Sequence, residues 1–280
     1  MEKLCALLFD VDGTLADTER DGHRVAFNRA FEEAGVGWFW DETRYGELLR
    51  VTGGKERIRL FISEDWPELL REPDIDRRIK ALHAAKTRHY LSLLEAGAIP
   101  LRPGVRRLLK EARAAGLRLA IATTTTPENV TTLLRTALGE SERGESGRVE
   151  SGRGDSRLGG SGTDWFEVIA AGDVVPAKKP APDIFELALS ELGLQAAQCI
   201  ALEDSENGLQ ASLGAGIPTV VTTNSYTKDQ EFTGALAVLD GFGEPGNPVT
   251  AHAGTPPVSG YVDVASLVAW HAAAQAKVPS

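Results

Sequence analysis

The sequence predicts an α/β fold: a core domain with a Rossmann-like, doubly wound parallel sheet, and an inserted α-helical cap domain. Short apolar runs alternate with helical patterns along most of the chain, as in a parallel sheet covered by helices. The runs are apolar throughout, which is typical of strands buried on both faces. A long stretch after the first run has helical patterns and no strand, and the 280 residues have room for two domains.

Each expected element has a local signal. The candidate strands are five apolar runs: 4–9, 118–123, 166–171, 199–203 and 218–223. Apolar residues recur at helical spacing from Val105 to Ala112, which predicts a helix there. Further helices are expected at 183–194 and at 264–276, the last with Asp263 as its N-cap.

The helical stretch predicts how the chain divides into domains. We expect a core domain of residues 1–16 and 97–280, and a helical cap domain of residues 17–96. Apolar residues share one helix face in this cap: Phe27, Ala30, Phe31 and Ala34. Proline and glycine at 97–104 mark the return to the core.

Two segments read as irregular. Residues 139–163 include eight glycines and five serines, so they cannot bury enough apolar area to offset the entropy of ordering. We expect a flexible surface insertion with no catalytic part; a regulatory or partner-binding loop is the alternative. Residues 241–260, with five glycines and four prolines, form the second irregular segment.

Composition excludes several classes of protein. Acidic residues outnumber basic ones 40 to 30, for a net charge of −10, and the sequence pI is near 5.1. Because nucleic-acid coats and binders of anionic membranes need a basic face, we expect neither nucleic acid nor membrane as a partner. No apolar run approaches the ~18 residues of a membrane span, and Asp10 and Asp12 interrupt the apolar start, so no signal peptide is predicted.

We expect a cytoplasmic monomer, although a chloroplast stromal protein without its transit peptide would have the same pattern. The two cysteines, Cys5 and Cys199, cannot build a disulfide framework. We expect reduced thiols that pack as small hydrophobic groups, close together if their strands are neighbours.

The strongest chemical signal is FDVDGTLADTE at 9–19. Asp10 and Asp12 are two residues apart where a strand should end, so both project to one side at the edge where open α/β sheets bind ligands. Gly13 permits a sharp turn directly afterwards. Two carboxylates this close favour a bound cation or a shared proton, whereas a pair of capping or turn aspartates is the structural alternative.

This segment resembles motif one of the haloacid-dehalogenase-like (HAD) phosphatases, DxDGT, and later segments complete the set. Thr123, followed by Thr124 and Thr125, resembles the second, hydroxyl-bearing motif; a strand-end turn is the alternative. Lys179 in KKPAPDIF resembles the family's lysine, with Lys178 as the alternative amine. Glu203 and Asp204 resemble the acidic fourth motif; capping of a helix near Asn207 is the other interpretation.

The resemblance implies a mechanism and a cofactor. Asp10 would attack phosphorus and form an aspartyl-phosphate, while Asp12 would serve as acid and then base. Mg²⁺ would be held by the Asp10 carboxylate, the Asp12 backbone carbonyl and Asp204, with Glu203 acting through water. Phosphate oxygens would be bound by Thr123, Thr124 and Lys179.

The cap also has candidate substrate-binding residues. Gly53 and Gly54 precede a helix start, where free N–H groups and Lys55 can face an anion. Together with Arg57 and Lys86, these groups predict a site for a second phosphate, while a solvated helix surface is the alternative. The remaining candidates are Glu19 and His23, which could bind sugar hydroxyls or assist proton transfer. The alternative is that both are ordinary surface residues.

Within the superfamily, the chain resembles the CbbY-type sugar-bisphosphate phosphatases, close to the β-phosphoglucomutases. The segments that carry this resemblance include GTLADTE, HRVAFN, TGGKERI, ATTTTPENV and AKKPAPDIF. It implies hydrolysis of xylulose 1,5-bisphosphate, a Rubisco inhibitor, to xylulose 5-phosphate. The alternatives are a β-phosphoglucomutase-like isomerase, a phosphoglycolate-type phosphatase and a phosphosugar-binding protein without activity.

Overall fold

The computed structural model describes residues 2–51, 53–139 and 162–276. The chain divides into two compact units, the first formed by Met1–Asp17 and Pro100–Ser280 and the second by Thr18–Ile99. The second unit therefore begins at Thr18 rather than at residue 17, and ends at Ile99 rather than at residue 96. The expected insertion at 139–163 falls almost wholly on residues 140–161, outside the described residues.

The first unit is built on one sheet, which has seven strands in the described residues, in the order β3-β2-β1-β4-β5-β6-β7. The strands are β1 (Ala6–Phe9), β2 (Arg118–Thr123), β3 (Val168–Ala171), β4 (Cys199–Glu203), β5 (Thr219–Thr222), β6 (Ala237–Leu239) and β7 (Ala251–Gly254). Strands β1 to β6 pair in parallel, whereas β7 pairs antiparallel with β6. The expected doubly wound parallel sheet is confirmed.

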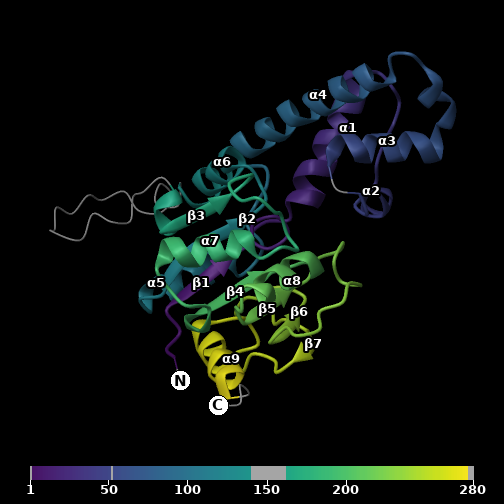
Figure 1. The fold of residues 1–280 in the computed structure, drawn as a ribbon. Helices are drawn as coiled ribbons and strands as arrows, with labels where there is room; N and C mark the ends of the chain where they lie inside the picture. The colour runs from purple at the N-terminus through teal and green to yellow at the C-terminus, as the bar shows by residue number, and fades with distance from the viewer. Residues whose placement is uncertain (1, 52, 140–161, 277–280) are drawn as a thin grey trace, which may run out of the picture. The chain divides into compact units, whose positions relative to one another are not determined.

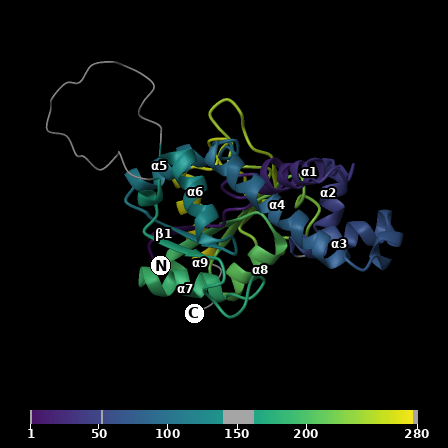
Figure 2. The same ribbon diagram turned by 90° about the horizontal axis from the view of Figure 1, so that it is seen from above.

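Helices cover both faces of this sheet. They are α5 (Val105–Ala114), α6 (Pro127–Leu138), α7 (Asp183–Leu192), α8 (Glu206–Gly214) and α9 (Val264–Ala276). The chain builds β1, β2 and β3 in one direction and then returns to build β4 and β5 on the other side of β1. Because parallel crossovers are right-handed, this reversal places α5 and α6 on one face and α7 and α8 on the other, as Figure 2 shows.

The three predicted helices of the core are present, with small shifts at their ends. Helix α7 ends at Leu192 because Gly193 adopts a left-handed conformation, φ 62°. The Asp263 carboxylate accepts a hydrogen bond from the Ser266 N–H at 2.7 Å, so it caps α9 as expected. Cys5 directly precedes β1 and Cys199 begins the neighbouring strand β4, and both cysteines are free.

Strand β1 is buried on both faces, which explains its continuously apolar sequence. Ala6 and Leu8 point to the face covered by α7, where they belong to a cluster with Phe185 and Cys199. By strand alternation, the residue two positions after Leu8 points to the same face. Asp10 therefore leaves the sheet on the side of α7.

The second unit is helical. Its elements are a π-helical turn η1 (Thr18–His23), α1 (Arg24–Glu33), α2 (Glu42–Leu48), α3 (Gly54–Asp65), a 3₁₀ turn η2 (Pro67–Arg71) and α4 (Ile75–Glu95), with no strand among its described residues. Helix α4 packs against α1 and α3 (Figure 1).

Aromatic rings form the core of this second unit. Trp40 is fully buried, and its ring centroid lies 4.7–5.4 Å from those of Phe27, Phe31 and Phe61. Phe27, Ala30 and Phe31 share the buried face of α1 as expected. The prediction was wrong for Ala34, which lies beyond the last residue of α1 and is exposed.

The expected irregular segment 241–260 contains a strand, β7, at Ala251–Gly254. Its residues are largely exposed and pair only with β6 at the edge of the sheet, so they have no apolar pattern to reveal them. Strand β6 (Ala237–Leu239) was also not predicted, because three buried residues are too short a run for a periodicity argument.

Among the helices in the described part of the chain, none combines the length and the apolar character that crossing a bilayer requires.

Burial of β1 leads to a stability prediction. Leu8 is fully buried in the sheet, so Leu8→Ala should lower the free energy of unfolding by about 2–5 kcal/mol. Leu213→Ala removes the same atoms from a site on α8 that is 36% exposed, and should cost roughly 1 kcal/mol or less. Urea unfolding followed by circular dichroism measures both; equal losses would contradict the assigned core.

Candidate active site

The carboxyl ends of the parallel strands bring the predicted core residues together. Phe9 pairs with Leu202 across β1 and β4, and the Asp10 N–H donates to the Leu202 carbonyl at 3.0 Å. Asp10 and Glu203 therefore occupy neighbouring positions at the point where the strand order reverses. This reversal point is where open α/β sheets bind ligands.

Three buried carboxylates and one lysine lie in contact there. Ligand oxygens of Asp10, Glu203 and Asp204 lie within 4.8 Å of one another. Lys179 Nζ lies 2.6 Å from Asp10 Oδ1 and 2.6 Å from Glu203 Oε1, and its side chain is only 8% exposed. Lys179 is thus an integral part of the cluster.

Lys178, the alternative amine, forms an exposed ion pair with Asp173 at 2.6 Å. Lys179 is instead buried, and its ammonium lies 5.0 Å from the ring of Phe185 in α7. Capping by Glu203 or Asp204 is also not what the structure shows. Helix α8 is capped by Ser205, whose hydroxyl accepts from the Gly208 N–H at 3.2 Å.

Burial disfavours the charged forms of the residues in this cluster. Burial raises the pKa of Asp10 to about 7; Lys179 opposes this shift, while Glu203 and Asp12 add to it. Burial, together with Asp10 and Glu203, also raises the pKa of Asp204 well above its ordinary value. Burial lowers the pKa of Lys179, but the two carboxylates outweigh it, so the net shift is upward and the amine stays charged.

The donor set suits a hard divalent cation. Three closely spaced carboxylates offer only oxygen ligands, which Mg²⁺ prefers. One lysine in contact cannot neutralise three buried carboxylates, so an added cation would relieve their mutual repulsion. Asp12 does not belong to this group of carboxylates.

Asp12 instead faces the loop after β2. The Thr125 hydroxyl donates a short hydrogen bond to Asp12 Oδ2. Thr123, 1% exposed, ends β2, and its hydroxyl accepts from the Thr125 N–H at 3.3 Å, whereas Thr124 is exposed. Sequence reasoning chose Thr123 and Thr124 but not Thr125 as a site residue. The run of four threonines gave no means to distinguish which hydroxyl turns toward Asp12.

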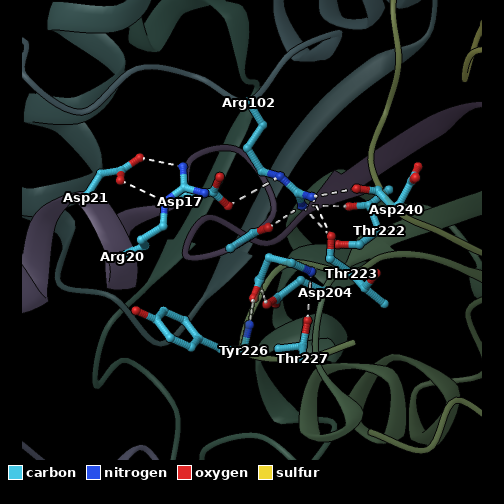
Figure 3. A network of polar contacts seen from close by, with 12 residues as sticks. Asp17, Arg20, Asp21, Arg102, Asp204, Thr222, Thr223, Tyr226, Thr227 and Asp240 are labelled. Carbon is cyan, nitrogen blue, oxygen red and sulfur yellow. Dashed lines mark hydrogen bonds and ion pairs between the residues drawn. The ribbon is translucent and has the colours of Figure 1, made fainter. Parts of the chain in front are cut away.

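Gly13 is required by close packing. Its φ is 87°, and a Cβ placed there would lie 2.3 Å from Asp204 Oδ2 and 2.7 Å from Asn224 Nδ2. Asn224 donates to Asp204 Oδ2 at 2.7 Å and was not predicted (Figure 3 shows Asp204 in this network). A signal for Asn224 was present in the sequence, because the polar pair Thr223 and Asn224 directly follows the buried strand β5.

The second unit has its own cluster of charged side chains. The Tyr45 hydroxyl forms a short hydrogen bond with Glu19 and accepts from Arg57 Nη1 at 2.9 Å. His23 Nδ1 lies 2.7 Å from Lys86 Nζ. Burial and the nearby cations lower the pKa of His23 well below its ordinary value, so neutral His23 accepts and charged Lys86 donates.

Arg57 and Lys86 are 8% and 9% exposed, so neither belongs to a solvated helix surface. Lys55 and Gly53, in contrast, are exposed. The start of α3 is also less open than expected, because a Cβ on Gly53 would lie 2.3 Å from Glu56 Oε2. The Glu56 carboxylate thus lies beside the backbone N–H groups at the start of α3, where an anion was expected.

The pKa of Asp10 has a consequence for stability. Because the folded-state pKa, about 7, exceeds the ordinary 3.8, Asp10 contributes stability that is fully present below pH 4 and lost as pH rises through 7. In the Asp10→Asn variant, the amide side chain at this position cannot ionise. The free energy of unfolding of the metal-free wild type should therefore fall relative to that of the variant between pH 4 and 8, by roughly 1.4 kcal/mol per unit of pKa shift.

Denaturant titrations in a chelator at several pH values measure this difference. Parallel pH curves for the two proteins would contradict the unfavourable burial of Asp10.

Comparison with known proteins agrees with this geometry. The haloacid dehalogenase-like hydrolase family model matches residues 6–216. The CbbY protein of Cupriavidus necator is 46% identical over 95% of this chain and 96% of its own. The crystal structure of a CbbY variant from Rhodobacter sphaeroides in complex with xylulose 1,5-bisphosphate is 44% identical. It covers 87% of this chain and 96% of its own, with a TM-score of 0.66.

A putative β-phosphoglucomutase from Thermotoga maritima is more distant, at 26% identity and a TM-score of 0.61, covering 85% of this chain and 94% of its own. The matches to the hydrolase family and to CbbY proteins extend over both the strand-end motifs and the helical unit. The chain is therefore an enzyme of the haloacid dehalogenase-like hydrolase family and belongs to its CbbY group.

Proposed function

We propose that this enzyme is a magnesium-dependent phosphatase that hydrolyses xylulose 1,5-bisphosphate to xylulose 5-phosphate. The observation that carries the proposal is the buried cluster of Asp10, Glu203 and Asp204 in contact with Lys179 at the sheet edge. The choice of substrate is supported by the 44% identity to a CbbY protein crystallised with this bisphosphate.

In the proposed reaction, an Asp10 oxygen attacks phosphorus, and the bond between phosphorus and the sugar oxygen breaks. Asp12 gives a proton to the leaving oxygen, and the phosphoryl group remains on Asp10 as an aspartyl-phosphate. Asp12 then takes a proton from water, which attacks the same phosphorus; the bond between phosphorus and the Asp10 oxygen breaks, so that inorganic phosphate leaves and the Asp10 carboxylate is restored. The hydrogen bond from Thr125 supports this role, because it holds the Asp12 carboxylate in one orientation.

The metal ligands in this proposal are the carboxylates of Asp10 and Asp204 and the backbone carbonyl of Asp12, with Glu203 acting through water. Bound there, Mg²⁺ would supply positive charge against the transferring phosphoryl oxygens. Lys179 supplies a second, permanent positive charge, because its ammonium contacts both Asp10 and Glu203. The hydroxyl of Thr123 and the exposed Thr124 complete the phosphate site as hydrogen-bond donors.

The second unit serves as a cap that binds the other phosphate of the substrate. Arg57 and Lys86 are its buried cations, and buried, low-dielectric surroundings strengthen their attraction to an anion. Neutral His23 and the Glu19–Tyr45 pair provide neighbouring groups that can bind sugar hydroxyls. Gly53, Gly54 and Lys55 remain in the proposal as the outer part of this site, nearest to solvent.

A substrate panel tests the proposal. Phosphate release should be measured with xylulose 1,5-bisphosphate, sugar monophosphates and 2-phosphoglycolate, with and without Mg²⁺. The highest kcat/KM is expected for the bisphosphate, with activity lost in chelator. Equal rates on all esters would reject the bisphosphate preference, and conversion of β-glucose 1-phosphate to glucose 6-phosphate without phosphate release would indicate a mutase instead.

Replacing the nucleophile separates chemistry from folding. Asp10→Asn should lower phosphate release to background, because an amide does not form the acyl-phosphate under these conditions. The circular dichroism spectrum should stay that of the wild type, since the two side chains have the same shape. Turnover retained by this variant would overturn the assignment of Asp10.

Two arginines of α3 form a matched pair for testing the cap. Arg57→Met should raise the KM for the bisphosphate roughly 10- to 100-fold, because a charge-assisted hydrogen bond to phosphate is lost. KM for a sugar monophosphate should change far less. Arg59→Met removes an exposed arginine paired with Asp76 and should leave both KM values unchanged; equal effects of the two variants would contradict the assigned phosphate site.

A further inference from the structure

Arg102 is a buried arginine that the proposed chemistry does not use. It precedes α5, and its side chain is 7% exposed. Its guanidinium lies within bonding distance of oxygens from several segments: the Gly13 carbonyl, Asp17 Oδ1 at 3.4 Å, the Thr222 carbonyl at 2.9 Å, the Thr223 carbonyl at 2.6 Å and the Asp240 carbonyl at 3.4 Å. Figure 3 shows Arg102 between Asp17 on one side and Thr222, Thr223 and Asp240 on the other.

These contacts join two segments that both touch Asp204. Gly13 follows the catalytic pair of motif one, and its backbone packs directly against Asp204 Oδ2 and Asn224 Nδ2. Thr222 and Thr223 immediately precede Asn224. The guanidinium of Arg102 therefore fixes the spacing between the loop after Asp12 and the residue that binds Asp204.

The orientation of the Asn224 amide is also determined. Its Oδ1 accepts a hydrogen bond from the Tyr226 N–H at 2.9 Å, so the amino group is left to face Asp204. Its Nδ2 donates to Asp204 Oδ2 at 2.7 Å. In addition, the Asn224 N–H donates to the Thr227 hydroxyl at 3.0 Å, which fixes the backbone of this turn.

We propose that Arg102 and Asn224 are positioning residues, which act through Gly13 and the end of β5 to hold the Asp204 carboxylate oriented before a divalent cation binds. The inference rests on the proposed function, in which Asp204 is a cation ligand. Lysine cannot replace Arg102 in this role. Its single nitrogen keeps the charge but cannot reach the Gly13, Thr223 and Asp17 oxygens as a planar guanidinium does.

The test measures binding of Mn²⁺ alone, so that it does not depend on turnover. Electron paramagnetic resonance reports free Mn²⁺ in titrations of wild type, Arg102→Lys, Asn224→Ala and the double variant. Partners that orient metal ligands typically change affinity 10- to 100-fold, so we expect each single variant to weaken Mn²⁺ binding by roughly tenfold or more. The double variant should lose less than the product of the two single losses, because both act on one carboxylate.

Arg107→Lys is the matched control. Arg107 also has several acceptors, namely Glu111, Glu244 and the carbonyls of Gly243 and Val262, each at 3.0 Å, but it ties α5 to the C-terminal segment instead of to Asp204. This variant should keep the Mn²⁺ affinity of the wild type. High Mg²⁺ should restore the kcat of the Arg102 and Asn224 variants toward the wild-type value, which a general loss of folding would not allow.

The outcomes are distinct. If wild type binds Mn²⁺ and the folded Arg102→Lys and Asn224→Ala variants bind it within twofold as tightly, the inference is overturned while the proposed function stands. An equal loss in Arg107→Lys also overturns it. Wild type that binds no Mn²⁺ overturns the proposed function and the inference together. Should Arg102→Lys fail to fold, the Asn224→Ala affinity decides.

Discussion

The repulsion among three buried carboxylates constrains the whole sheet edge. Asp10, Glu203 and Asp204 have little solvent to stabilise their charges, and Lys179 is the ammonium in contact with two of them. The surrounding residues offset this unfavourable charge. Asn224 and Arg102 oppose the rise in the pKa of Asp204, and a divalent cation would complete the compensation. The fold therefore tolerates unfavourable burial of charge at this edge of the sheet.

The parallel sheet explains how this cluster is assembled from distant parts of the sequence. Strands β1 and β4 are neighbours because the strand order reverses between them, and their shared register puts Asp10 beside Glu203. Lys179 arrives from the turn before α7, on the face to which Asp10 points. The helical unit instead holds its cations, Arg57 and Lys86, against aromatic rings, at 5.1 Å from Tyr45 and 4.9 Å from Tyr90.

Strands and site residues could be predicted from the sequence where a single local pattern identified them. Continuously apolar runs predicted β1 to β5 because these strands are buried on both faces, and β7 was missed because it is an exposed edge strand. Motif spacing identified Asp10, Lys179, Glu203 and Asp204, all of which lie together. At Gly53, the structure adds the nearby Glu56 carboxylate, a contact that a motif does not show.

By itself, the sequence determined the fold class, the family and the acidic residues at the strand ends, because each depends on residues adjacent in the chain or in a fixed motif order. Only the tertiary structure decided which groups contact those acids and the loops beside them. Thr125, Asn224 and Arg102 reach their partners across 113, 20 and up to 138 residues of sequence. Such contacts depend on strand register and side-chain direction, which neighbouring residues do not encode.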